Sequence, residues 1–116
     1  MPLLSLKTSA AIEDGQKTKL LGQLSKIVAD DLGKPVQYVM VTIEQADIVH
    51  ARDASPAAFV DVRSIGGLNA DVNATMCGHV CLLLGEELGI LPERVYMNFV
   101  DVPASSWGTN GGVFGG

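Results

Sequence analysis

The sequence predicts an α/β fold made of two tandem β-α-β units, with a four-stranded mixed sheet and two helices on one face. Two amphipathic segments with helical spacing each lie between segments of strand-forming residues. Both helical segments end in Leu-Gly with a proline close behind, in "LGKPVQYVMV" and "LGILPERVYMNF". This repetition predicts two parallel strand pairs with right-handed crossovers, and therefore a two-layer sandwich.

The first unit begins with a strand over residues 2–7 and continues with a helix over about residues 13–32. Gly33 ends this helix and Pro35 prevents it from resuming. Residues 38–43 are nearly all apolar and β-branched, which is typical of a central strand buried on both faces. The apolar side chains that share one face of the helix are Leu20, Leu21, Leu24, Ile27, Val28 and Leu32.

The second unit repeats this plan with a strand over residues 57–64, "AAFVDVRS". The turn "IGGLNADVN" leads into the next helix, with Asn69 or Asn73 as its N-cap. Gly89 ends that helix, and residues 94–100 form the last long strand. The apolar stripe of the helix comprises Val72, Met76, Val80, Leu83, Leu84 and Leu88.

The tail, "DVPASSWGTNGGVFGG", is rich in Gly, Ser and Pro and predicts loops with short strands around Trp107 and Phe114. Two helices on one face of a sheet leave the other face without cover within the chain. We therefore expect the apolar residues of that face to pack against other subunits.

Composition sets the broad class. The chain of 116 residues fits one domain over residues 1–116, and its 47% hydrophobic content supports a core. The net charge is −5, with eight scattered basic residues, so neither nucleic acid nor an anionic membrane is an expected partner. No apolar run reaches the roughly 18 residues that a membrane span needs. No basic leader of a signal peptide is present, so we expect a cytoplasmic protein, with non-classical secretion as an open alternative.

The two cysteines, Cys77 and Cys81, favour neither a disulfide nor a metal site. They lie four residues apart in a helical segment, where reduced thiols are expected. His79 lies between them, but on a helix it points about 200° away from Cys77. We predict no metal and no cofactor, and no serine triad is apparent.

Three features carry candidate chemistry. Pro2 either opens a strand or, after removal of Met1, exposes a secondary amine that can act as a general base. Lys34 is either a solvated cation beside a helix C-terminus or a clamp for a carboxylate. The turn "SIGGLN" has backbone N–H groups that an anion could bind, although it lacks the phosphate-loop pattern.

A resemblance changes the weight of these features. Met-Pro at the start, "LGKPVQYVMV", "PAAF", "SIGGLN", "RVYMNF" and "NGGVF" occur in an order and spacing that together resemble the macrophage migration inhibitory factor family of the tautomerase superfamily, in its microbial or plant forms. The resemblance covers essentially the whole chain. It implies a homotrimer whose three sheets enclose a central channel, with active sites at the subunit interfaces.

The resemblance also implies an activity and its residues. The activity is keto–enol tautomerisation of aryl α-keto acids such as phenylpyruvate, with Pro2 as the base. Lys34 holds the substrate carboxylate, and the backbone N–H of Ile65 is a second anchor. The remaining implied residues are Tyr38 and Phe114 in an aromatic pocket, and Tyr96 and Asn98 from the neighbouring subunit.

Three departures from the family pattern bear on this expectation. Thr109 stands where the family often has a tryptophan, and Trp107 is expected to compensate. His50-Ala51-Arg52 replaces a common Phe-Gly-Gly. Ala57 and Val60 stand in place of a Cys-x-x-Cys pair, so a thiol-redox activity is not expected.

Two alternatives stay open. One is a cytokine-like signalling or binding protein with weak or vestigial catalysis. The other is hydration or dehalogenation of small unsaturated acids, for which Arg52 is a candidate residue but a paired acid is missing.

Overall fold

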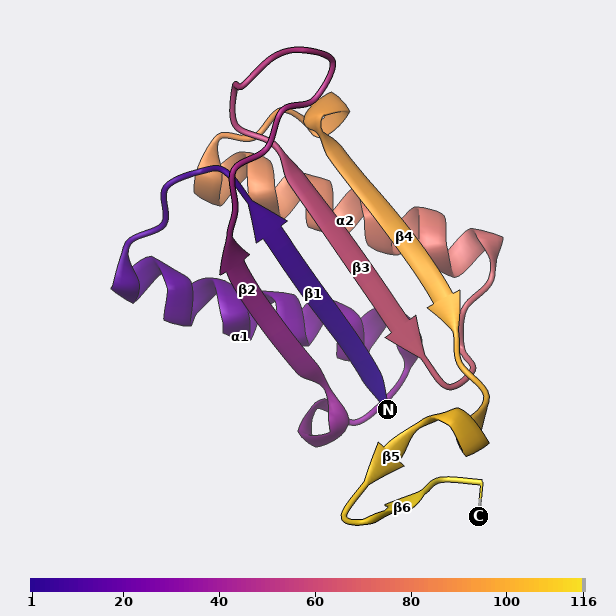
Figure 1. The fold of residues 1–116 in the computed structure, drawn as a ribbon. Helices are drawn as coiled ribbons and strands as arrows, with labels where there is room; N and C mark the ends of the chain where they lie inside the picture. Colours follow the sequence, from indigo (N-terminus) through magenta and orange to yellow (C-terminus); the bar gives the residue numbers. More distant parts are fainter. Residues whose placement is uncertain (116) are drawn as a thin grey trace.

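A computed structural model describes residues 1–115 and confirms the tandem β-α-β plan. The sheet has the strand order β2-β1-β3-β4, with parallel outer pairs and an antiparallel central pair. Both helices cover the same face of the sheet (Figure 1). The elements are β1 (Pro2–Thr8), α1 (Asp14–Leu32), β2 (Met40–Gln45), β3 (Ala58–Ser64), α2 (Ala70–Leu88) and β4 (Val95–Asp101).

The core lies between the sheet and the two helices. Alternate residues of the central strands, such as Leu4 and Leu6 in β1, are fully buried because successive side chains point to opposite faces. The helices add residues at spacings of three and four, as their patterns predict. The fully buried core members are Leu4, Leu6, Leu20, Leu24, Val28, Val60, Val62, Met76, Val80 and Leu84.

The prediction of a central strand over residues 38–43 is wrong. Tyr38 ends a short 3₁₀ turn, Val36–Tyr38, and the strand that follows, β2, lies at one edge of the sheet. Val41 and Ile43 are half-buried against the core, whereas Met40 is 63% exposed on the other side. The two units pair through their first strands, β1 and β3, and this pairing leaves the second strand of each unit at an edge.

The helix ends follow the sequence signals. Gly33 and Gly89 have φ values of 64° and 68°, in the left-handed region that glycine adopts without strain. Of the two candidate caps, Asn69 is the N-cap of α2, and its side-chain oxygen accepts the N–H of Val72 at 2.9 Å. Asn73 lies inside the helix. The N-cap of α1, Glu13, makes no side-chain capping hydrogen bond.

Replacing Asn69 with alanine is expected to lower the free energy of unfolding by about 1 kcal/mol, because the N–H of Val72 loses its acceptor. Urea unfolding followed by circular dichroism measures this difference. The control is Asn69→Ser, which keeps a capping oxygen and is expected to retain most of the stability. An equal loss in both variants would show that the cap is not the cause.

The uncovered sheet face is mixed in character. Tyr96 and Phe59 are exposed on it, in agreement with the expected apolar surface. A polar row nevertheless crosses all four strands in register: Thr42, Ser5, Asp61 and Asn98. Thr42 Oγ1 donates to Ser5 Oγ at 3.0 Å. The face therefore combines two kinds of side chain. The apolar ones favour association with other subunits, and the polar ones favour contact with water.

The tail forms a small hairpin, as expected. Strands β5 (Gly108–Thr109) and β6 (Gly112–Val113) pair across a turn at Asn110 and Gly111, both with positive φ. The N–H of Phe114 donates to the carbonyl of Trp107 at 3.1 Å, so Trp107 and Phe114 flank the hairpin. Among the residues described, no helix meets the length and apolarity that a membrane crossing requires.

Candidate active site

Pro2 opens β1 and is buried at the end of the sheet from which the hairpin extends (Figure 1). It pairs in register with Ser64, and as the first strand residue it has no ladder N–H to supply. A cavity of about 280 Å³ adjoins it. The cavity is lined by Met1, Pro2, Leu3, Gln37, Tyr38, Val39, Met40, Trp107, Gly108 and Thr109.

Lys34 approaches this end of the sheet from the C-terminus of α1. Its backbone N–H bonds to the carbonyl of Ala29, which completes the helix cap. Its half-buried side chain donates from Nζ to the carbonyl of Ile65 at 2.9 Å. Ile65 directly follows β3, so the fold brings together the lysine and the second proposed anchor from opposite β-α-β units.

The electrostatics of the chain start favour a neutral amine. Burial, and after it the positive charge of Lys34, lower the pKa of the Met1 α-amino group below its ordinary value. This effect also shows that the ammonium of Lys34 is close to the start of β1. An amine at this position is therefore less protonated near neutral pH than an exposed one.

Tyr38 and Trp107 supply aromatic surface to the cavity beside Pro2, and Thr109 lines it as well. The structure thus places Trp107 on the same wall as Thr109. Phe114 is not part of this lining; it is exposed and directly follows β6, the second strand of the hairpin. Within one chain, therefore, Tyr38 and Trp107 line the cavity beside Pro2 and Phe114 does not.

Tyr96 and Asn98 are not brought to Pro2 within the chain. Register places Pro2 opposite Ser64, and Ser64 opposite Asp101. Tyr96 precedes Asp101 by 101 − 96 = 5 residues, or roughly 16 Å along the strand. Both side chains are exposed on the open face of β4, the edge strand farthest from β2.

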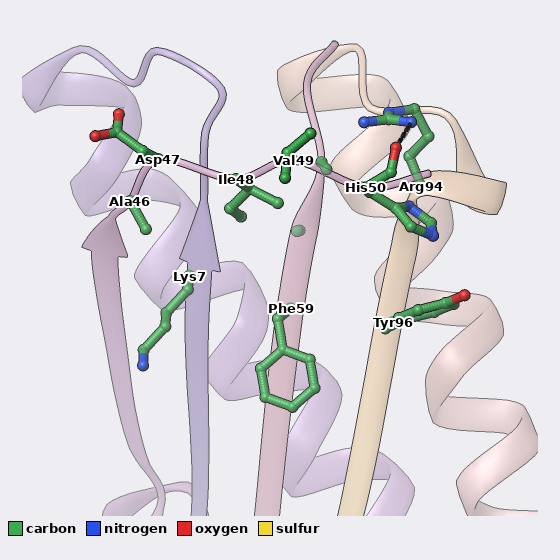
Figure 2. Close-up of a pocket in the computed structure, with 11 residues that line it drawn as sticks. Lys7, Ala46, Asp47, Ile48, Val49, His50, Phe59, Arg94 and Tyr96 are labelled. Atoms are coloured by element: carbon green, nitrogen blue, oxygen red, sulfur yellow. Dashed lines mark hydrogen bonds between the residues drawn. The ribbon is translucent and has the colours of Figure 1, made fainter. Parts of the chain in front are cut away.

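Tyr96 lines a second cavity, of about 440 Å³, at the opposite end of the sheet (Figure 2). Phe59 from β3 and Lys7 from β1 also line this cavity. The loop after β2 forms the upper wall, with Ile48, Val49 and His50. The rings of His50 and Tyr96 are 4.6 Å apart at an angle of 58°.

The sequence reasoning missed Arg94, which ends the 3₁₀ turn Pro92–Arg94 directly before β4 and lines this second cavity. Its side chain is only 10% exposed and donates to backbone carbonyls of the loop before β3. Carbonyl acceptors leave no side-chain pattern in a sequence, so no signal pointed to this arginine. Arg52, the candidate pocket arginine, is exposed and lines neither of these cavities.

The cysteines of α2 are free thiols. Burial, with a contribution from Cys77, raises the pKa of Cys81 to about 11, which leaves it a poor nucleophile. His79 points away from them to Asp31, with Nδ1 and Oδ2 2.8 Å apart. Within residues 1–115, no group of three or more histidine, cysteine, aspartate or glutamate side chains is arranged to hold a metal ion.

Comparison with known proteins shows relatives of the whole chain and of its fold. A family model described as macrophage migration inhibitory factor (MIF) matches residues 1–115. A macrophage migration inhibitory factor homolog from Trichuris trichiura is 34% identical over 98% of this chain and 100% of its own length. A solved MIF-like structure from Entamoeba histolytica has a TM-score of 0.94 at 26% identity, covering 97% of this chain and 98% of that one. A homologue structure from Prochlorococcus marinus has a TM-score of 0.91 at 34% identity, covering 97% and 99%.

Proposed function

The chain belongs to the macrophage migration inhibitory factor family, and on this premise we propose that it is a keto–enol tautomerase for aryl α-keto acids such as phenylpyruvate. Two observations carry the proposal: Pro2 lines a cavity with aromatic walls, and Lys34, which donates to the Ile65 carbonyl, acts electrostatically on the start of the strand that Pro2 opens. The three residues come from different parts of the sequence, and together they offer a base, a cation and a backbone anchor.

Pro2 is proposed to act as the base once Met1 has been removed. Burial and the charge of Lys34 lower the pKa of the Met1 α-amino group at this end of β1, and the Pro2 amine is expected to experience the same environment. This secondary amine takes a proton from C3 of the keto acid, and the electron pair moves to the carbonyl oxygen. Return of a proton to that oxygen gives the enol, and the reverse sequence gives the ketone. Atoms and charge balance without a cofactor.

Lys34 is proposed to hold the substrate carboxylate. Its Nζ already donates to the Ile65 carbonyl, which holds the ammonium beside the end of β3. A charged hydrogen bond to the carboxylate keeps C3 beside Pro2, while Tyr38 and Trp107 contact the aryl group. This arrangement suits an acid with one aromatic substituent.

Replacing Lys34 with glutamine is expected to raise KM for phenylpyruvate roughly 10- to 100-fold, the value of one charged hydrogen bond. The KM is measured by following the ultraviolet absorbance of the enol. Lys26→Gln is the matched control, because Lys26 is an exposed lysine of α1, the helix that precedes Lys34, and is paired with Asp30. Equal effects in the two variants, or none in Lys34→Gln, would remove Lys34 from the site.

A homotrimer is proposed to complete the site. Tyr96 and Asn98 lie too far along the sheet to reach the Pro2 of their own chain, and they are exposed on its uncovered face. Association through this face would bring them to the Pro2 end of a neighbouring chain. Light scattering after gel filtration is expected to give three times the 12.2 kDa chain mass; a monomer with full activity would contradict the shared site.

The second candidate function is cytokine-like binding with weak catalysis. It is favoured by Thr109, which lines the cavity beside Pro2 with a small side chain. Such a side chain offers less contact area to the aryl group of a substrate than an aromatic residue would. Turnover of phenylpyruvate by a protein with a free Pro2 separates the two: rapid turnover supports the tautomerase, and negligible turnover supports binding.

A further inference from the structure

Arg94 clamps one loop of the chain through an unusual number of backbone contacts. Its guanidinium donates to the carbonyls of Pro56 at 3.1 Å, His50 at 3.2 Å, Asp53 at 2.9 Å and Ser55 at 3.0 Å. The carboxylate of Asp53, 3.8 Å from Nη1, balances part of the charge of Arg94. Because the guanidinium is planar and rigid, its four hydrogen bonds hold the carbonyls in fixed positions. Figure 2 shows the bond to His50 as a dashed line.

The clamped loop has a conformation that would not persist by itself. Ala51 and Arg52 have φ values of 53° and 61°, in the left-handed region that side chains with a Cβ disfavour. His50 and Asp53 exchange two backbone hydrogen bonds of 3.0 Å across this turn. Strained backbone of this kind persists only where contacts with the rest of the structure hold it in place. Here the hydrogen bonds from Arg94 hold it.

The turn delivers the imidazole of His50 onto the ring of Tyr96. The ring centroids lie 4.6 Å apart, within the range in which aromatic pairs attract one another. Tyr96 stands on an edge strand and is 63% exposed, so its rotamer is set by few neighbours. The imidazole packs against one face of the phenol and restricts the directions that it can take (Figure 2).

We propose that His50 is a positioning residue that fixes Tyr96, with Arg94 as the clamp that holds His50. The inference rests on the proposed function, in which Tyr96 reaches the site of the neighbouring subunit. There the ordered phenol forms a wall for the aryl group of the substrate. His50 thereby sets the preference for aryl over alkyl α-keto acids, because an alkyl acid does not extend to that wall.

The first test compares two substrates. Exchange of C3 protons for deuterium, followed by NMR, gives kcat/KM for phenylpyruvate and for pyruvate. His50→Ala is expected to lower the phenylpyruvate-to-pyruvate ratio roughly 2- to 10-fold, mainly through KM. His50→Phe restores a ring against Tyr96 and is expected to restore the ratio. A ratio that His50→Ala leaves unchanged would overturn the specificity role, as would equal losses in the alanine and phenylalanine variants.

The second test observes Tyr96 directly and needs no turnover. The chain has two tyrosines, so ring-labelled tyrosine gives two sets of NMR signals, assigned with Tyr38→Phe. Arg94→Lys keeps the charge but cannot donate to four carbonyls, and His50→Ala removes the tilted ring that packs against Tyr96. Both are expected to shift the Tyr96 ring protons in the same direction, away from the wild-type position. Unshifted signals in His50→Ala would overturn the positioning role.

The two tests separate this inference from the function on which it rests. A wild-type protein with a free Pro2 and no turnover removes the tautomerase proposal. The Tyr96 signals then decide the positioning role alone: movement in both variants supports it, and no movement overturns it. If Arg94→Lys fails to fold, the His50→Ala spectrum carries the decision.

Discussion

Pro2→Gly is expected to lower kcat/KM for phenylpyruvate about 100- to 1000-fold, within the range that a positioned general base contributes. Glycine leaves an amine at the same place, but it is a primary amine without the ring that fixes the nitrogen at the start of β1. The ring also fills the buried position beside Tyr38 and Trp107, which glycine leaves open to water. Both changes weaken the base without removing the carboxylate clamp.

The measurement is the enol assay on protein whose intact mass shows that Met1 is absent. Circular dichroism and light scattering on Pro2→Gly test whether the fold and the assembly are kept. When both are kept, a loss of activity can be assigned to the base. Lys26→Gln again supplies the reference for a substitution outside the site. Activity in Pro2→Gly equal to that of the wild type would contradict the catalytic role.

The largest expected effect on stability is that of Leu84→Ala. Leu84 is 0% exposed and lies in α2 against the sheet, so its truncation removes apolar contacts and leaves a cavity. A loss of about 3–4 kcal/mol in the free energy of unfolding is expected. Urea unfolding measures it at fixed protein concentration, because assembly would contribute to the apparent stability.

Leu82→Ala is the matched control for Leu84→Ala. The two leucines are two residues apart in the same helix, but Leu82 is 62% exposed. Its truncation is expected to change the free energy of unfolding by less than about 0.5 kcal/mol. Similar losses in the two variants would mean that the placement of α2 on the sheet is incorrect.

Much of the fold follows from local sequence signals. The apolar stripes and the glycines at positions 33 and 89 predict the first helix to within a residue and the C-terminal end of the second, because left-handed caps favour glycine and buried faces follow the helical period. The sequence does not decide where the second helix starts, because Asn69 and Asn73 are both suitable caps. The edge placement of β2 did not follow. Its apolar run resembles a central strand, and only the pairing of β1 with β3, residues distant in sequence, decides which strands lie inside.

The candidate site divides in the same way. Pro2 and Lys34 can be identified as candidates from the sequence. The hydrogen bond from Lys34 to Ile65, however, depends on how the two β-α-β units pack against each other. Phe114, expected in the aromatic pocket, does not line the cavity beside Pro2 within one chain, whereas Trp107 and Thr109 of the same hairpin region do. Arg94 could not be found from the sequence at all, because its partners are backbone carbonyls.

The pH dependence follows from the sign of the shift at the chain start. A base whose pKa is lowered is neutral, and therefore active, down to a lower pH. We expect kcat/KM to be level near neutral pH and to fall as pH decreases through the pKa of the Pro2 amine. The environment that produces this shift is the burial and the Lys34 charge that already lower the pKa of the Met1 α-amino group.

A ¹⁵N NMR titration of proline-labelled protein tests the central claim most directly. The account predicts one proline nitrogen with the shift of a secondary amine, titrating below the value near 8 that is usual for an α-amino group. Lys34→Gln is expected to raise that pKa, because a neighbouring positive charge is removed. Five amide-type prolines and no titrating nitrogen would contradict the account, since an amide at Pro2 cannot act as the base.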